Sequence, residues 1–144
     1  ALRRPKDALP HLDAAVALRP DSAAAHANRG RALQQLGRGP EARLAYAKAW
    51  ALAPDSATVA RSIANLAADA GRNVEAAAWY RRALALAPDD AETHNNLGTV
   101  LAEDGHVAEA VKEFETAVRL NPAYVAARQN LAAARQSVGA NPPP

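Results

Sequence analysis

Side chains able to form hydrogen bonds recur in this sequence at intervals of 34 residues. One row consists of Asn28, Ser62, Asn96 and Asn130. An amide side chain offers one acceptor and two donors, and the main chain of an extended peptide presents matching groups at regular intervals. Asn is a poor helix former, so its recurrence among good helix formers needs a reason beyond local structure. We therefore interpret these residues as candidates for binding a peptide main chain.

Two further rows lie one and three residues away from the first. They consist of Ala27, Arg61, Asn95 and Gln129, and of Arg31, Asn65, Thr99 and Ala133, with Thr58 and Glu92 one turn earlier and Gln34 and Gln35 one turn later. The guanidinium groups of Arg31 and Arg61 suit an acidic side chain or a terminal carboxylate. The candidate peptide-binding residues are Asn28, Arg31, Arg61, Asn65, Glu92, Asn95, Asn96, Thr99, Gln129 and Asn130. The alternative stays open that the amides solvate an exposed helix face or bond within the protein.

Other kinds of site are not indicated. The chain has no cysteine, which excludes thiolate metal ligands and disulfides. His106 and Glu109 are spaced three apart, but two ligands without a third do not make a metal site. Gly37 and Gly39 lack the flanking pattern and the lysine of a phosphate-binding loop. We predict no catalytic residues, no metal, no cofactor and no enzymatic activity.

The elements that would position these side chains follow a strict period. Prolines, glycines and alanines each recur every 34 residues, at Pro20, Pro54, Pro88 and Pro122, at Gly37, Gly71, Gly105 and Gly139, and at Ala8, Ala42, Ala76 and Ala110. A fixed period of this length is typical of stacked repeat architectures.

Each period predicts two helices. In residues 57–90, the stretch 57–70 has no Gly or Pro and Gly71 suits the left-handed end of a helix. A second helix is predicted over 74–86, where Pro88 prevents continuation and Asp89 offers an N-cap for the next helix. Asp21 and Asp55 occupy the equivalent place. The short connections predict antiparallel neighbours.

The apolar residues fit this arrangement. In the last full period they recur at spacings of three and four, as Val107, Ala110, Val111, Phe114, Ala117, Val118 and Leu120, which indicates one buried stripe on a helix. Tyr46, Tyr80 and Phe114 are equivalent by the 34-residue shift. Small residues at Gly30 and Gly98 would let the paired helix pack closely.

These motifs resemble the tetratricopeptide repeat family over residues 6–139. The residues that carry the resemblance are Leu97, Gly98, Gly105, Ala110, Phe114, Ala117 and Pro122. The resemblance implies an all-α fold, a right-handed α-solenoid of antiparallel helix pairs, whose first helices line a concave side. The Asn row is similar to the peptide-binding ladder of the O-linked N-acetylglucosamine transferase repeat region. Arg61, Asn65 and Asn96 match part of the carboxylate clamp of family cochaperones, but Ala126 and Asn130 replace its remaining two basic residues.

Some positions depart from the family pattern. His26, Ala60, His94 and Arg128 stand where the family often has Trp. Arg29 replaces a leucine, so we expect it to find a carboxylate or water, because an unpaired buried charge is costly. Ala123 replaces the capping Asp, so the last helix is expected to begin differently.

The predicted organisation is one array. It comprises a partial repeat at 1–22, full repeats at 23–56, 57–90 and 91–124, a terminal capping helix at 125–139 and a Pro-rich tail at 140–144. Pro10 is expected to bend or delay the first helix. The chain begins within a repeat and without Met, so we expect it to be part of a longer protein.

The composition of the chain limits the classes of partner that the sequence predicts. The 40 alanines favour ordered, closely packed helices, and the formal net charge is only +2. Neither a basic stripe with interleaved aromatics nor a membrane-spanning run is present, so neither nucleic acid nor membrane is predicted as a partner. The compartment is not assigned, although the absence of cysteine favours the cytoplasm.

The sequence therefore predicts a non-catalytic module that binds an extended peptide or partner segment in a concave groove. One alternative is the substrate-recruiting repeat region of a larger glycosyltransferase. A second is a self-assembly scaffold that associates through its cut repeat ends.

Overall fold

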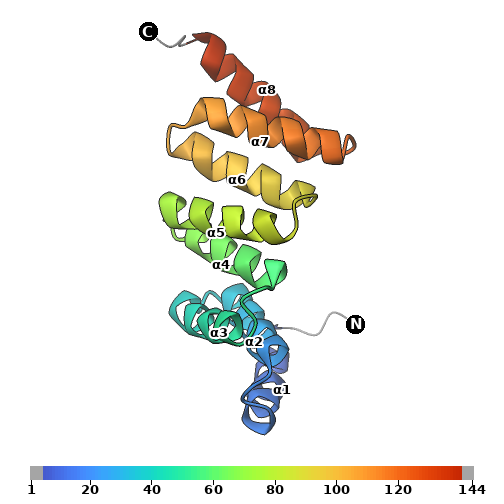
Figure 1. Ribbon diagram of the computed structural model, residues 1–144. Helices are drawn as coiled ribbons and strands as arrows, with labels where there is room; N and C mark the ends of the chain where they lie inside the picture. The colour runs from blue at the N-terminus through green and yellow to red at the C-terminus, as the bar shows by residue number, and fades with distance from the viewer. Residues whose placement is uncertain (1–4, 141–144) are drawn as a thin grey trace.

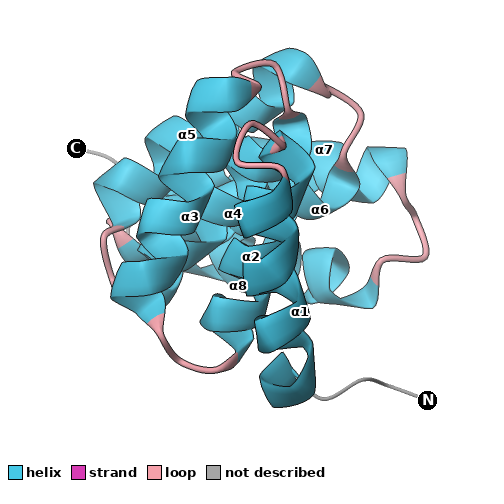
Figure 2. Cartoon of the chain, turned by 90° about the horizontal axis from the view of Figure 1, so that it is seen from below, coloured by secondary structure: helices cyan, strands magenta, loops and turns pink. Residues whose placement is uncertain are grey.

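The protein is an array of helices without strands over the residues that the structure describes, 5–140 of a computed structural model (Figures 1 and 2). The helices are α1 (Pro5–Leu18), α2 (Ala23–Gln35), α3 (Gly39–Leu52), α4 (Ala57–Asp69), α5 (Asn73–Leu86), α6 (Ala91–Glu103), α7 (Val107–Leu120) and α8 (Val125–Ala140). The predicted all-α solenoid is confirmed. Within the same range, no helix combines the length and the apolar character needed to cross a membrane.

The helices stack in antiparallel pairs along one axis (Figure 1). The most extensive contacts join α2 with α3, α4 with α5 and α6 with α7. We call α2, α4, α6 and α8 the first helices, and α1, α3, α5 and α7 the second helices. Successive first helices contact one another, whereas the backbones of successive second helices do not approach as closely in the described part of the chain. The array therefore curves with the first helices on its inner, concave side.

The turns show how the repeat residues end each helix. Gly37, Gly71 and Gly105 follow first helices with φ of 73°, 69° and 85°, a conformation that glycine adopts without steric cost. Gly139 lies inside α8 instead, because that helix extends to Ala140. The tail residues 141–144 lie outside the described range.

The predicted N-caps were wrong by one residue. Ser22, Ser56 and Asp90 cap α2, α4 and α6, each with extended backbone angles and a side-chain oxygen that accepts from the first turn. The aspartates predicted at 21, 55 and 89 belong to the preceding turn. A cap must stand directly before the first helical residue to reach the free N–H groups, and the proline turn takes one residue more than expected.

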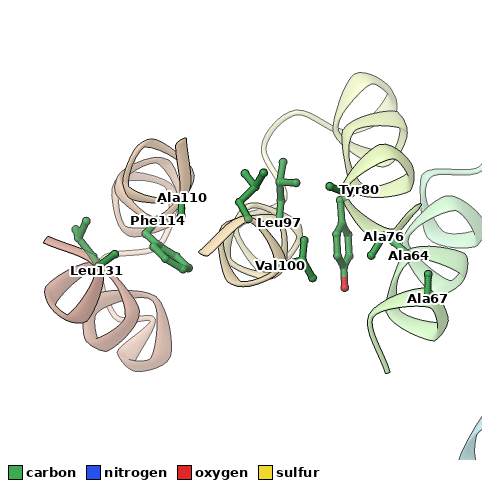
Figure 3. Close-up of a cluster of buried hydrophobic side chains, with 12 residues drawn as sticks. Ala64, Ala67, Ala76, Tyr80, Leu97, Val100, Ala110, Phe114 and Leu131 are labelled. Atoms are coloured by element: carbon green, nitrogen blue, oxygen red, sulfur yellow. The ribbon is translucent and has the colours of Figure 1, made fainter. Parts of the chain in front are cut away.

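The core is thin and consists mainly of alanine around one aromatic ring per repeat. Tyr46, Tyr80 and Phe114 are only 1–2% exposed. Figure 3 shows Tyr80 next to Val100 of the following repeat, and Phe114 between Ala110 and Leu131. The small residues matter here, because a Cβ added to Gly98 would lie 2.6 Å from Phe114 Cε1.

The residues that depart from the family pattern have partners. Arg29 Nε donates to Asp13 Oδ1 at 2.6 Å, which confirms the expected carboxylate. The imidazole Nε2 atoms of His26 and His94 lie 2.9 Å from the carbonyl oxygens of Pro20 and Pro88. Each histidine therefore ties its helix to the proline turn before it.

Helix α1, at the start of the array, contains a proline in its interior. Pro10 lies within α1, which is continuous from Pro5 to Leu18.

On the second helices, Trp50 and Trp79 pack edge to face with ring centroids 5.1 Å apart. Arg82 lies over the Trp79 ring at 4.5 Å. This aromatic contact joins α3 to α5.

Candidate functional site

A hollow of about 400 Å³ opens on the concave side between the first helices; we call it the central hollow. Its lining residues are Gln34 of α2, Asn65, Ala68 and Asp69 of α4, Tyr80 of α5, and Asn96, Thr99, Val100 and Glu103 of α6. Three pairs of these side chains are equivalent by the 34-residue shift, namely Gln34 and Ala68, Asn65 and Thr99, and Asp69 and Glu103. Three of the predicted site residues, Asn65, Asn96 and Thr99, are thus brought together.

The floor of the central hollow is a network of hydrogen bonds. Tyr80 Oη donates to Asn65 Oδ1 at 2.6 Å, and Tyr46 Oη donates to Gln34 Oε1 at 3.1 Å. Gln34 Nε2 in turn donates to Asp69 Oδ2 at 2.8 Å. The tyrosine hydroxyls engage both amide oxygens, which leaves the Asn65 amide nitrogen as a donor. Thr99 Oγ1 instead donates to Asn95 O at 3.0 Å within its own helix.

Two carboxylates in the central hollow were not predicted. Asp69 and Glu103 are 34 residues apart and each is the last residue of its helix. The negative end of a helix dipole disfavours an anion there, and neither helix has a basic residue in its last turn. The signal was present in the sequence as a repeat-equivalent acidic pair. The predicted site did not include this pair because the prediction rested on recurring amide side chains.

The surroundings of the central hollow shift the pKa of Tyr80, the tyrosine that lines it. Burial raises the pKa of Tyr80 well above its usual value, and the nearby carboxylates of Asp69 and Glu92 raise it further. Burial likewise raises the pKa of Tyr46. Both hydroxyls are therefore neutral donors at neutral pH, as the hydrogen bonds to the amide oxygens require.

The remaining predicted residues fall outside the central hollow. Asn130 lines a neighbouring hollow of about 240 Å³ between α6, α7 and α8, which shares Thr99 and Glu103 with the central one. Asn28 and Arg31 line a separate hollow of about 260 Å³ between α1 and α2. The Asn row is thus divided among three concavities.

The two candidate arginines already have partners. Arg31 Nη2 donates to Asn28 Oδ1 at 2.8 Å, within the same helix. Arg61 Nη1 lies 2.5 Å from Glu92 Oε2 and 3.2 Å from Asp90 Oδ2. Arg61 and Glu92 therefore form an ion pair between α4 and α6, which makes Arg61 a poor anchor for an acidic ligand.

Asn95 and Gln129 do not line any of these three hollows. Asn95 is only 6% exposed, and its Oδ1 accepts from Asn130 Nδ2 at 2.9 Å. This bond joins α6 to α8, so Asn95 serves packing between repeats in this structure rather than an open surface. Gln129 is exposed on α8. In the described residues, no group of three or more His, Asp or Glu side chains is placed to hold a metal ion.

Several solved structures share this fold. "Crystal structure of MamA" has a TM-score of 0.88 and 19% identity, and covers 94% of this chain and 79% of that chain. "MamA RS-1 ArsTM double mutant" has a TM-score of 0.88 and 21% identity over 94% of this chain and 76% of that one. "First TPR of Spaghetti (RPAP3) bound to HSP90 peptide SRMEEVD" has a TM-score of 0.80 and 19% identity, and covers 82% of this chain and 94% of that chain. At these identities the likeness shows the fold.

The sequence comparisons agree with the structural ones. A model described as "TPR repeat" matches residues 64–105, and models described as "Tetratricopeptide repeat" match residues 1–57 and 91–124. No curated protein matches the chain. The three models together cover most of the sequence and fit the 34-residue period, the glycine turns and the helix pairs. The chain belongs to the tetratricopeptide repeat family.

Proposed function

We propose that this chain is a non-catalytic protein-interaction module that binds an extended peptide segment in its central hollow. The observation that carries the proposal is the convergence of amide side chains from three successive first helices, Gln34, Asn65 and Asn96, on one concavity. The solved RPAP3 repeat with its HSP90 peptide supports the same class of ligand for this fold.

The dimensions of the array suit an extended ligand. Neighbouring packed helices lie roughly 8–10 Å apart, and an extended chain rises about 3.3 Å per residue. Successive first helices touch less extensively than such packed pairs, so one repeat spans at least this distance, which corresponds to about three or more peptide residues. Since the tyrosines hold the amide oxygens of Gln34 and Asn65, the free Nδ2 of Asn65 is available to donate to a peptide carbonyl oxygen.

Selection from a displayed library of random dodecapeptides tests this function without a known partner. We expect peptides to be enriched on the protein and to bind Asn96→Ala roughly 2- to 12-fold more weakly, as the loss of one hydrogen bond implies. The matched control is Gln136→Ala, which removes an exposed amide of α8 outside the hollows. Failure to enrich any peptide, or equal binding to both variants, would contradict the proposed function.

A further inference from the structure

We infer that the central hollow recognises a basic side chain, Lys or Arg, of the bound peptide. This inference rests on the proposed function and specifies its ligand. The sequence had instead suggested an acidic ligand, because Arg31 and Arg61 were expected to point into the groove. The structure gives those arginines other partners, and it places carboxylates in the hollow.

The charged side chains that line the central hollow are all acidic. Its acidic side chains are Asp69 and Glu103, and no Lys, Arg or His lines it. Asp69 Oδ2 accepts from the neutral amide of Gln34, which leaves the charge in place. In the part of the chain that the structure describes, Glu103 has neither an ion pair nor a hydrogen-bond partner for its side chain.

The backbone adds to this negative potential. Asp69 and Glu103 end α4 and α6, where the last carbonyl groups carry the negative end of the helix dipole. A carboxylate at such an end is unfavourable for the helix itself, so the pair is not explained by helix stability. A ligand cation between the two helix ends would offset both the side-chain and the backbone charge.

The amides and the carboxylates can act on different parts of one ligand. Amide nitrogen atoms donate to peptide carbonyl oxygens, whereas an ammonium or guanidinium group is a pure donor and needs the carboxylates. Both carboxylates are exposed, so salt screens the attraction. We therefore expect the preference for basic residues to weaken as ionic strength rises.

The test repeats the peptide selection on the native chain and on Asp69→Asn/Glu103→Gln, which keeps the shape of both side chains and removes both charges. The matched control is Asp55→Asn/Asp89→Asn. It also removes two exposed charges 34 residues apart, but at the proline turns outside the central hollow. Net charge is the same in the two variants, so only the position of the lost charge differs.

We expect Lys or Arg to be enriched at one peptide position on the native chain and on the control, and not on Asp69→Asn/Glu103→Gln. For a selected peptide, exchange of that basic residue for norleucine should weaken binding to the native chain by up to about fivefold at low salt. The same exchange should have little effect on binding to the charge-neutral variant.

The outcomes separate the two proposals. If selected peptides depend on Asn96 but show no basic preference, or if both double variants lose that preference equally, the inference about charge is wrong and the proposed function stands. If no peptide is selected at all, the proposed function is wrong and the inference is wrong with it.

Discussion

Tyr80 donates a hydrogen bond to Asn65 Oδ1 across 2.6 Å, and this contact links the buried core of one repeat to the floor of the central hollow. The ring is 2% exposed while its hydroxyl reaches the concave side. In the third repeat Phe114 replaces Tyr80, and Thr99, which is equivalent to Asn65, bonds its own helix instead. In these two repeats, the polar residue beside the tyrosine is bonded across helices, whereas the one beside the phenylalanine is bonded within its own helix.

Tyr80→Phe should remove this bond without a change in packing. We expect the free energy of unfolding to fall by about 0.5–1.5 kcal/mol, the usual net value of one hydrogen bond. Peptide affinity should fall too, because the Asn65 amide loses its fixed orientation. Urea unfolding followed by circular dichroism measures the first effect. Unchanged stability together with unchanged affinity would show that the bond does not hold Asn65 in place.

Gly98→Ala should destabilise the protein although alanine is the better helix former. Alanine gains about 1 kcal/mol over glycine in a helix interior, but the new Cβ would lie 2.6 Å from Phe114 Cε1, and overpacking costs about 1–3 kcal/mol. Thermal unfolding gives the sign. In a Phe114→Leu background the same change should cost less, and a stabilised single variant would contradict the close contact.

Asn130→Ala should weaken the attachment of α8. It leaves the buried Asn95 Oδ1 without its partner, at a cost of about 1–3 kcal/mol. Amide hydrogen exchange should become faster in α8 before it does so in α4. The control Asn28→Ala removes the equivalent, exposed residue of α2 and should change stability by less than about 0.5 kcal/mol. Equal effects of the two variants would contradict the role of the Asn95–Asn130 pair.

Alkaline pH should destabilise the array through Tyr80. Burial, followed by the charges of Asp69 and Glu92, raises the pKa of Tyr80 well above its usual value. The unfolded chain loses this proton near pH 10 and the folded chain keeps it, so the stabilisation is complete below pH 10 and is lost as the pH rises further.

At about pH 11 the contribution of Tyr80 amounts to a loss of about 1.4 kcal/mol in the free energy of unfolding. Urea unfolding at near-neutral and alkaline pH measures this loss, which should be smaller by that amount in Tyr80→Phe. Tyrosinate absorbance that rises before helicity falls, and that is missing in Tyr80→Phe, would show that the Tyr80 hydroxyl ionises in the folded state and would contradict the prediction.

Much of the fold was predictable because the repeat residues act locally. Pro88 and Gly71 end helices by their own backbone constraints, and the need of Arg29 for a carboxylate follows from its charge. The N-caps were misplaced because Asp89 and Asp90 are chemically equal candidates, and only the geometry of the turn selects the second.

The site was less predictable, because a repeat position fixes where a side chain starts and not which neighbour it meets. Asn95 and Asn96 occupy adjacent rows, yet Asn95 is buried against Asn130 while Asn96 lines the central hollow. Arg61 was assigned to a ligand because its partners, Asp90 and Glu92, lie 29 and 31 residues away in the sequence. These pairings depend on the curvature of the array, which the period alone does not specify.

An amide-resolved NMR titration with a selected peptide tests the central claim most directly. If the central hollow binds the peptide, the side-chain amide signals of Gln34, Asn65 and Asn96 shift together. The amides of Asn73 and Asn121 and the indoles of Trp50 and Trp79 stay in place. Shifts confined to the tryptophans, with the three hollow amides unmoved, would place the binding surface on the second helices and contradict the account.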